Sequence, residues 1–442
     1  MLSRTLAIRG EIAWVLVGQA LNVLGNLLSI KVLALVIGAH GYGQLALGIS
    51  VSTAVNMLMF GPLMQGIIRF ESQYAEQRAM PAYLAAVRAS LARGGAIFGV
   101  ASAAGVAVAW LLGGAEWASL ILAAAIFGLI SSIVAGAQSF LTIRRRRRAV
   151  ALFQSSDIWL RVLVAVAATL LCERFIGSPG GVAPLIGFAL GSSIILFIQL
   201  IYLRRHEPEL VRQWRDSYAP SDRLRCERQL WEYTRAFLVF APLSFAGQFA
   251  DRWVLQFSLS EADVGIFAAL LQIASAPATV ITTVIVQLFL PLVFSTASGL
   301  QTADRVSGAV RFVRVAVALA TFACLLLVPI YVVAGELIVR ILATSEFAAS
   351  SHLLWILGIA AALFNVGTVV TLTGQALKDV RIYIVAYAIK AVSMVVIAPW
   401  IAPVYGTAGV CWALVAANGV FLLIAMRANG ILQARTLRAL AT

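Results

Sequence analysis

The chain has 442 residues, of which 61% are hydrophobic and 12% are charged, and its mean hydropathy is +0.94. This composition excludes a soluble globular domain and a disordered chain, and it indicates a polytopic membrane protein. The formal net charge of +14 comes mainly from Lys and Arg in short polar stretches between apolar segments. These charges predict topology, and we expect no nucleic-acid partner.

Twelve apolar segments are long enough to cross a bilayer as helices, because each holds about 17 or more mostly apolar residues. In chain order they are residues 12–38, 44–68, 94–112, 117–143, 149–172, 182–203, 236–259, 264–295, 313–334, 353–374, 383–399 and 406–427. The first segment is too long for the core of a signal peptide, so we expect it to remain as the first span.

The positive charges assign an orientation to these spans. If both termini are cytoplasmic, the cytoplasmic connections carry 27 Lys and Arg, whereas the opposite side carries two, Arg174 and Arg340. The positive-inside rule therefore predicts cytoplasmic N- and C-termini. The densest signal is the run of five Arg at 144–148, which is expected to fix topology and can also touch anionic lipid headgroups.

The longest polar stretch divides the chain in two. Residues 204–235 mix Arg with acidic residues and carry Trp214 and Trp231, which suits an amphipathic helix along the cytoplasmic interface. The predicted domains are thus an N-lobe of six spans (1–203), this cytoplasmic linker, and a C-lobe of six spans (236–442).

A faint internal repeat supports the same division. Residues 29–47 align without a gap with residues 251–269, with four identities, and both stretches join the first and second span of their half. The predicted fold class is therefore all-α, with about twelve transmembrane helices in two pseudo-symmetric six-helix lobes.

Four cations lie inside the predicted spans: Lys31, Arg161, Arg252 and Lys390. A charge near the bilayer centre costs at least ~3 kcal/mol on insertion scales, so it is kept where it faces water, a counter-ion or an anionic substrate. In the repeat, Lys31 falls one residue from the position of Arg252, and Arg161 and Lys390 lie in equivalent fifth spans. We predict that these four residues bind substrate between the repeats near the midplane.

Two acidic residues accompany the cations. Asp157 lies four residues before Arg161, so an intrahelical ion pair and a substrate contact are equally well supported. Asp251 directly precedes Arg252, and neighbours on a helix point about 100° apart, so this pair does not neutralise itself by simple packing. Both carboxylates are candidates for ion coupling. The excess of cations suits a phosphate-bearing ligand.

Other polar and small residues in the spans predict packing or a wet lining. Seven amide side chains in or near the spans could line an aqueous cavity or form interhelical hydrogen bonds: Asn22, Asn26, Gln248, Gln272, Gln287, Asn365 and Gln375. Two glycine pairs, 95 with 99 and 187 with 191, are spaced for close helix contact.

Catalytic constellations are missing from the sequence. The three His are not spaced as metal ligands, the four Cys form no CxxC, and there is no GxxxxGK[ST] phosphate-binding loop. We therefore predict a protein that is not an enzyme and needs no cofactor or metal. Its energy would come from an ion gradient, a membrane potential or the disequilibrium of its substrate.

Three stretches carry a family resemblance. IGAHGYGQLALGIS, residues 37–50, resembles the turn after the first helix of polysaccharide transporter proteins. Residues 251–269 resemble that family's Asp-Arg passage followed by Gly and an aromatic residue. Residues 341–363 are similar to its late external turn, with Thr344 and Phe347 in place of the usual Gly and Tyr.

The resemblance implies a fold and a function. Polysaccharide transporters, which include O-antigen and exopolysaccharide flippases, belong to the multidrug/oligosaccharidyl-lipid/polysaccharide (MOP) superfamily. Their MATE-like fold has two six-helix lobes around a cavity that opens alternately to either side. The implied substrate is an anionic oligosaccharide on undecaprenyl diphosphate, moved across the bacterial inner membrane. Expected partners are this substrate, membrane lipids and glycan polymerase or assembly proteins, and the expected state is a monomer.

Two other functions remain open. A MATE-type cation/drug antiporter of the same architecture would use Asp157 and Asp251, and the excess of cations argues against it. A scaffold for a glycan polymerase could act through residues 204–235, although no specific feature supports it. Protons and sodium are both open as driving ions.

Overall fold

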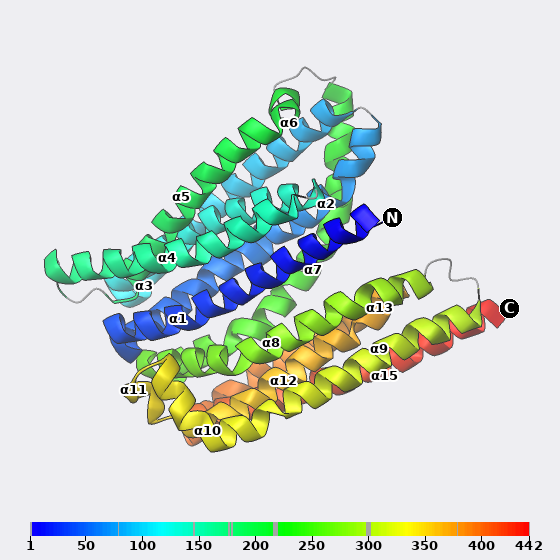
Figure 1. Ribbon diagram of the computed structural model, residues 1–442. Helices are drawn as coiled ribbons and strands as arrows, with labels where there is room; N and C mark the ends of the chain where they lie inside the picture. Colours follow the sequence, from blue (N-terminus) through cyan, green and yellow to red (C-terminus); the bar gives the residue numbers. More distant parts are fainter. Residues whose placement is uncertain are drawn as a thin grey trace. The chain divides into compact units, whose positions relative to one another are not determined.

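The computed structural model describes residues 2–77, 79–144, 146–175, 177, 180–214, 220–297, 302–377 and 379–441. All regular structure in these residues is helical (Figure 1). The α-helices are α1 (Leu2–Val55), α2 (Gly61–Glu76), α3 (Met80–Ile143), α4 (Arg147–Phe175), α5 (Val182–His206), α6 (Pro208–Gln213), α7 (Pro220–Ser258), α8 (Glu261–Ala297), α9 (Ala303–Leu325), α10 (Leu327–Leu342), α11 (Ser345–Ala348), α12 (Leu354–Val370), α13 (Leu372–Ala376), α14 (Ile384–Val392) and α15 (Ala398–Ala441). Single turns of π-helix or 3-10 helix join some of them: η1 (Asn56–Phe60), η2 (Ser351–Leu353), η3 (Arg381–Tyr383) and η4 (Ser393–Ile397).

Three of the long helices each contain parts of two membrane spans. Helices α1, α3 and α15 bend at Gly38 (φ 64°), Gly114 (φ 75°) and Gly406 (φ 60°), respectively. Glycine adopts this left-handed conformation without the steric strain that a Cβ would bring. At each bend, two spans are thus joined through a single non-helical residue.

Counting each bent helix as two spans gives eleven spans, and the second half of α7 adds one more. Eight described helical stretches are long and apolar enough to cross a membrane, and three of them contain one of these bends. The twelfth span is the second half of α7, which Gln248, Asp251 and Arg252 make less apolar. The described residues therefore form about twelve transmembrane helices, as the sequence predicts.

The helices form two compact units, Met1–Phe245 and Ala246–Thr442, and the division falls within α7. In unit 1, α4 packs against α1 and α5, and α3 packs against the same two helices (Figure 1). In unit 2, α12 packs against α8, α9 and α15, and α14 packs against α15. The predicted linker, 204–235, comprises the end of α5, α6, residues outside the description, and the first part of α7.

One of the two predicted glycine contacts is present. A Cβ on Gly187 of α5 would lie 2.3 Å from the Cα of Ala165 in α4, and Gly191 approaches α4 in the same way. Such distances exclude any side chain, so these glycines set the spacing between α4 and α5. The other prediction is wrong for the described residues, because a Cβ on Gly95 or Gly99 would meet nothing within 4 Å.

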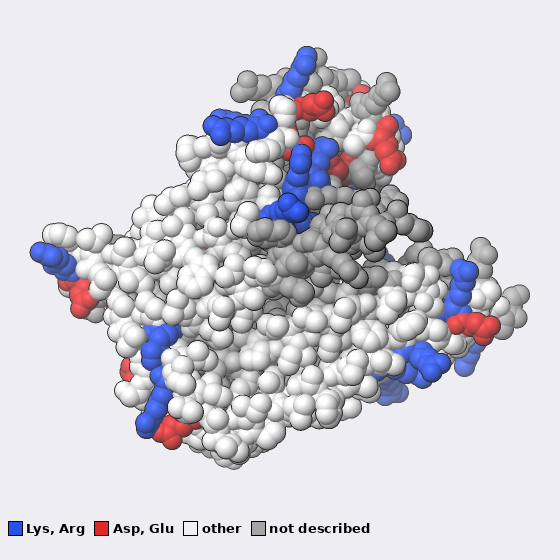
Figure 2. All heavy atoms as spheres, viewed as in Figure 1, with Lys and Arg blue, Asp and Glu red and all other residues white. Residues whose placement is uncertain are grey.

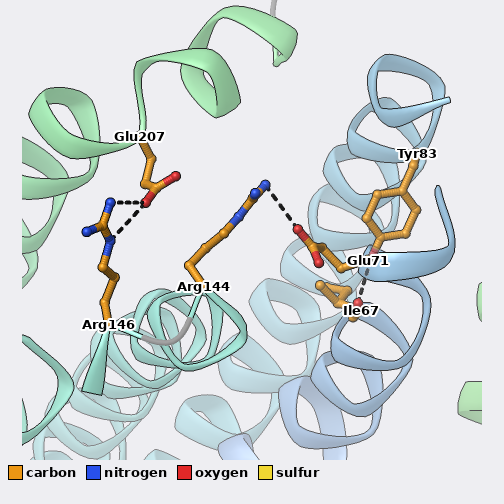
Figure 3. A network of polar contacts seen from close by, with 6 residues as sticks. All are labelled: Ile67, Glu71, Tyr83, Arg144, Arg146 and Glu207. Carbon is orange, nitrogen blue, oxygen red and sulfur yellow. Dashed lines mark hydrogen bonds and ion pairs between the residues drawn. The ribbon is translucent and has the colours of Figure 1, made fainter. Parts of the chain in front are cut away.

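Arginine side chains join helix ends at one end of unit 1, the end that the charge pattern predicts to be cytoplasmic (Figure 3). Arg144, which follows α3, forms an ion pair of 3.0 Å with Glu71 of α2. Arg146, which precedes α4, forms an ion pair of 3.1 Å with Glu207, which follows α5. Part of the run 144–148 therefore holds helix ends together in addition to its predicted role in topology.

The first half of α7 belongs to unit 1. Cys226 and Leu230 are buried in a cluster with apolar residues of α2 and α3. Glu227 accepts hydrogen bonds from Arg93 and Arg223. Trp231, on another face of the helix, is 60% exposed. Burial raises the pKa of the Cys226 thiol.

Charged side chains gather toward the ends of the helices. In the view of Figure 2, Lys, Arg, Asp and Glu lie in groups near helix ends, and broad areas of the described surface between them carry no charge. An uncharged band between charged ends is typical of a protein that crosses a bilayer.

Candidate functional site

A cavity of about 290 Å³ lies within unit 2, between α7, α8, α12, α14 and α15. Two of the four predicted cations, Arg252 and Lys390, line it together with Asp251. Three of the seven amides singled out from the sequence, Gln248, Gln272 and Asn365, line it as well. The fold thus brings α7 and α14, which are far apart in the sequence, to one polar cavity inside an apolar protein.

Lys390 is buried with only partial compensation for its charge. The residue is 3% exposed. Its Nζ atom lies 3.7 Å from the ring centroid of Phe364 and 5.9 Å from that of Phe421. Among the described residues, no carboxylate forms an ion pair with Lys390. A desolvated cation–π contact contributes ~2 kcal/mol, whereas burial of an unpaired ion costs several kcal/mol. Lys390 therefore lies where an anionic ligand would be favoured.

Two hydrogen-bond donors of Arg252 have no acceptor among the described residues. Its Cζ lies 4.7 Å from the ring centroid of Phe249. Its Nε and Nη1 atoms are buried and have no hydrogen-bond partner among the described residues. Buried donors of this kind are rare unless water or a ligand completes them. The Asp251 carboxylate accepts the backbone N–H of Arg252 at 2.8 Å.

The internal repeat relates this cavity to a contact in unit 1. Lys390 packs along α7, where its Cδ lies 3.5 Å from the Cβ position of Gly247. If the alignment of 29–47 with 251–269 is extended toward the N-terminus in the same register, Gly247 corresponds to Gly25. A Cβ on Gly25 would lie 2.6 Å from Ile158 and 3.4 Å from the indole nitrogen of Trp159 in α4. Lys390 thus takes the place of these two residues, and the predicted equivalence with Arg161 is offset by two or three residues.

Unit 1 contains a second polar cluster. Asp157 and Arg161 form the intrahelical ion pair that their spacing allows. The Ser192 hydroxyl of α5 donates to the other oxygen of Asp157 at 3.0 Å, and the Arg161 guanidinium lies 5.6 Å from the ring centroid of Phe127. Both oxygens of the Asp157 carboxylate are therefore occupied by neighbouring side chains. The Nε of Arg161 is buried and has no partner among the described residues.

The predicted site residues fall into two groups. Arg252, Lys390 and Asp251 meet in unit 2, and Asp157 meets Arg161 in unit 1. Lys31 lies in α1 of unit 1 and is partly buried. A single site that contains all four cations stays a prediction.

Several residues that line the cavity were not identified from the sequence. Phe249 and Phe364, which face the two cations, are aromatic residues in apolar spans and carry no distinguishing pattern. Asn418 of α15 also lines the cavity, and its amide donates to the Ala360 carbonyl at 2.8 Å. An amide within an apolar span is a signal that could have indicated Asn418.

No protein-family model matches the sequence, and no curated protein is detectably similar to it. Solved structures do resemble the fold. The lipid II flippase MurJ in an inward closed conformation superposes with a TM-score of 0.68 at 12% identity, covering 98% of this chain and 91% of that one. An inward-facing multidrug resistance MATE transporter of the MOP superfamily gives 0.65 at 12% identity, covering 95% and 96%.

A third structure is a MOP superfamily transporter from Pyrococcus furiosus, described as having a binding pocket of reverse polarity. It gives a TM-score of 0.57 at 14% identity, covering 96% of each chain. At such low identity these similarities show the fold alone. The chain therefore has the fold of MOP superfamily transporters, and the predicted MATE-like fold class is confirmed.

Proposed function

We propose that this protein is a membrane flippase that moves an anionic, polyprenyl-diphosphate-linked oligosaccharide from the cytoplasmic to the outer leaflet by alternating access. The observation that carries the proposal is the pair of cations in the unit 2 cavity, of which Lys390 is buried and Arg252 is partly buried. Arg252 has unpaired donors and Lys390 has no ion-pair partner among the described residues, and both line one cavity. A diphosphate offers several oxygens that accept charge-assisted hydrogen bonds from such groups.

We propose a role in substrate binding for several residues that line the cavity. Arg252 would donate through its free Nε and Nη1 atoms, and Lys390 would supply a second positive charge at the ring of Phe364. The amides of Gln248 and Gln272 suit sugar hydroxyls. The polyprenyl tail is expected to stay in lipid, because its burial among these polar groups would leave them unpaired.

Asp251 provides a means of coupling binding to an ion. Its carboxylate shares the cavity with the two cations and opposes an anionic headgroup by repulsion. A proton or a sodium ion at Asp251 would cancel that charge and favour the anion. We propose Asp251 as the ion-coupling residue of unit 2. Lys31 and Arg161 are proposed as cations that unit 1 supplies to the same substrate.

The second candidate function is a cation/drug antiporter that uses Asp251 and Asp157. Asp251 favours it, since it is a carboxylate in a cavity with two aromatic rings. Asp157 disfavours it, because Arg161 and Ser192 already occupy its oxygens. The lining of the unit 2 cavity holds two cations and one carboxylate, a charge that repels a cationic drug.

The proposed setting follows from the sequence. Both termini would face the cytoplasm of a bacterial cell, and the protein would lie in the inner membrane as a monomer. The substrate implies a surface polysaccharide pathway, in which glycan polymerase or assembly proteins are the expected partners.

The test is mass spectrometry of polyprenyl-linked intermediates, with analysis of surface glycans, in a strain that lacks this protein. The proposal predicts loss of one surface polysaccharide and accumulation of its lipid-linked unit, both restored by the wild-type chain and not by Arg252→Gln at equal abundance. Unchanged glycans together with sensitivity to cationic dyes would instead support the antiporter.

A further inference from the structure

A second cavity of unit 2 shares no lining residue with the first. It has a volume of about 370 Å³ and lies between α9, α15 and the α12–α13 segment. We call it the α9–α15 groove. Its apolar lining comes from residues spaced three or four apart, and so from one face of each long helix: Val310, Val313, Val317 and Ala318 of α9, Val370 of α12, and Met426 and Gly430 of α15.

The groove also has polar lining residues, Thr373 and Asn429, which bond to each other, and Arg314 with Gln433. Arg314 of α9 donates through Nη2 to Gln433 of α15 at 3.1 Å, so these two side chains bridge the helices. The Arg314 backbone lies between Val310 and Ala318 on α9. A helical side chain points back toward the start of its helix, and there the Arg314 guanidinium meets Gln433, the lining residue nearest the end of α15. The groove thus passes from an apolar interior to a cationic rim, like the two parts of a phospholipid.

The helix ends around this rim are strongly basic. Together α9 and α15 carry six arginines and one acidic residue, Asp304. The arginines are Arg305, Arg311, Arg314, Arg427, Arg435 and Arg438. Figure 2 shows basic side chains, with an acidic one among them, in the region where Figure 1 places the start of α9 and the end of the chain. Under the proposed orientation this end faces the cytoplasmic leaflet, where anionic lipids give the surface a negative potential.

We propose that the α9–α15 groove binds one anionic phospholipid of the bilayer, with an acyl chain along the valines and the phosphate at Arg314. Charge complementarity selects an anionic lipid over a zwitterionic one. The apolar stripe requires a hydrocarbon chain, since a free phosphate would leave it uncovered. This site is separate from the cavity of Arg252 and Lys390, and it does not depend on which substrate the protein moves.

The structure supplies a residue that can fill the groove. A Cβ on Gly430 would meet nothing within 4 Å, although Gly430 lines the groove. Gly430→Phe therefore places a ring in the groove without a clash at Cβ, and Gly430→Ala is its matched control. Arg314→Gln removes the rim charge, and Arg311→Gln removes an exposed charge from the same helix that does not line the groove.

The experiment is native mass spectrometry of the purified full-length protein with phosphatidylglycerol or phosphatidylethanolamine of identical acyl chains. The wild-type protein is expected to bind one phosphatidylglycerol about fivefold or more tightly than phosphatidylethanolamine, the ratio for one Arg at an anionic surface. Arg314→Gln should abolish this preference and Arg311→Gln should keep it. Gly430→Phe should lose the bound lipid, whereas Gly430→Ala should retain it.

Several results would overturn the proposal. Equal binding of the two lipids by the wild-type protein would do so, as would a preference that survives Arg314→Gln. Undecaprenyl phosphate that displaces phosphatidylglycerol at a tenth of its concentration or less, and that Gly430→Phe excludes, would assign the groove to a polyprenyl chain. If Gly430→Phe does not fold, the comparison of Arg314→Gln with Arg311→Gln decides alone. None of these measurements involves transport, so they are independent of the proposed function.

Discussion

Replacement of Lys390 by methionine should maintain or raise the stability of the protein and weaken its binding of an anionic headgroup. Methionine has a similar length and flexibility and no charge. The change removes the penalty of several kcal/mol for a buried, unpaired ammonium, and with it a cation–π contribution of ~2 kcal/mol at Phe364. We therefore expect Lys390→Met to melt at the wild-type temperature or higher, with a gain of up to ~2 kcal/mol.

The same variant should bind an anionic headgroup poorly. A charge-assisted hydrogen bond contributes about 1.5–3 kcal/mol, so its loss weakens binding about tenfold to a hundredfold. Melting can be followed with a thiol-reactive dye, because Cys226, Cys324 and Cys411 are buried. The control is Ile389→Met, at an exposed neighbouring position, which should change neither quantity.

Two results would refute this reasoning. A loss of ~2 kcal/mol or more in Lys390→Met would mean that the ammonium stabilises the fold. Headgroup binding at wild-type strength would mean that the charge is not used for the ligand.

The remaining predictions concern packing, ion pairs and pH. Gly187→Leu should destabilise the protein by about 2 kcal/mol or more, because the new side chain would clash with the α4 backbone. Gly95→Leu, the control, should have little effect. Equal melting temperatures for the two variants would contradict this prediction. Arg144→Gln leaves a buried carboxylate on α2 without its partner and should lower the free energy of unfolding by ~3 kcal/mol. Arg228→Gln, in an exposed ion pair, should lower it by less than ~1 kcal/mol. Similar shifts in melting temperature for the two variants would refute the comparison. Burial raises the pKa of Cys226. In a variant with Cys226 as its only cysteine, maleimide labelling at pH 8 should therefore be slower in the folded protein than in the unfolded one. Equal labelling rates would contradict this prediction.

The sequence predicted the overall fold because span length and charge asymmetry are both local properties. The turns between spans were harder to predict in detail. Gly38, Gly114 and Gly406 each end a span with a single left-handed residue, and glycine is too common in the neighbouring apolar segments to mark these positions. The division within α7 was also hidden, because the packing of Cys226 and Leu230 on α2 and α3 depends on contacts distant in sequence.

The candidate site was partly predictable. Arg252 and Lys390 were identified from the sequence because a charge inside an apolar span is costly and is rarely kept without a polar partner or a ligand. The spacing of Asp157 and Arg161 allowed their ion pair. The offset between Lys390 and Arg161 was not visible, because spans five and eleven could be aligned only by their order in the chain. Phe364 lay beyond prediction, because a ring beside a cation differs from other core aromatics only through tertiary contacts.

The most direct test of the proposed site is equilibrium binding of undecaprenyl diphosphate to the purified full-length protein. Wild type, Arg252→Gln and Lys390→Gln would be compared with Arg435→Gln, which removes an exposed charge outside the unit 2 cavity. The account predicts that each cavity variant binds about tenfold or more weakly and that Arg435→Gln binds like the wild type. Equal affinity in all four proteins would contradict the claim that the cavity of unit 2 holds the diphosphate.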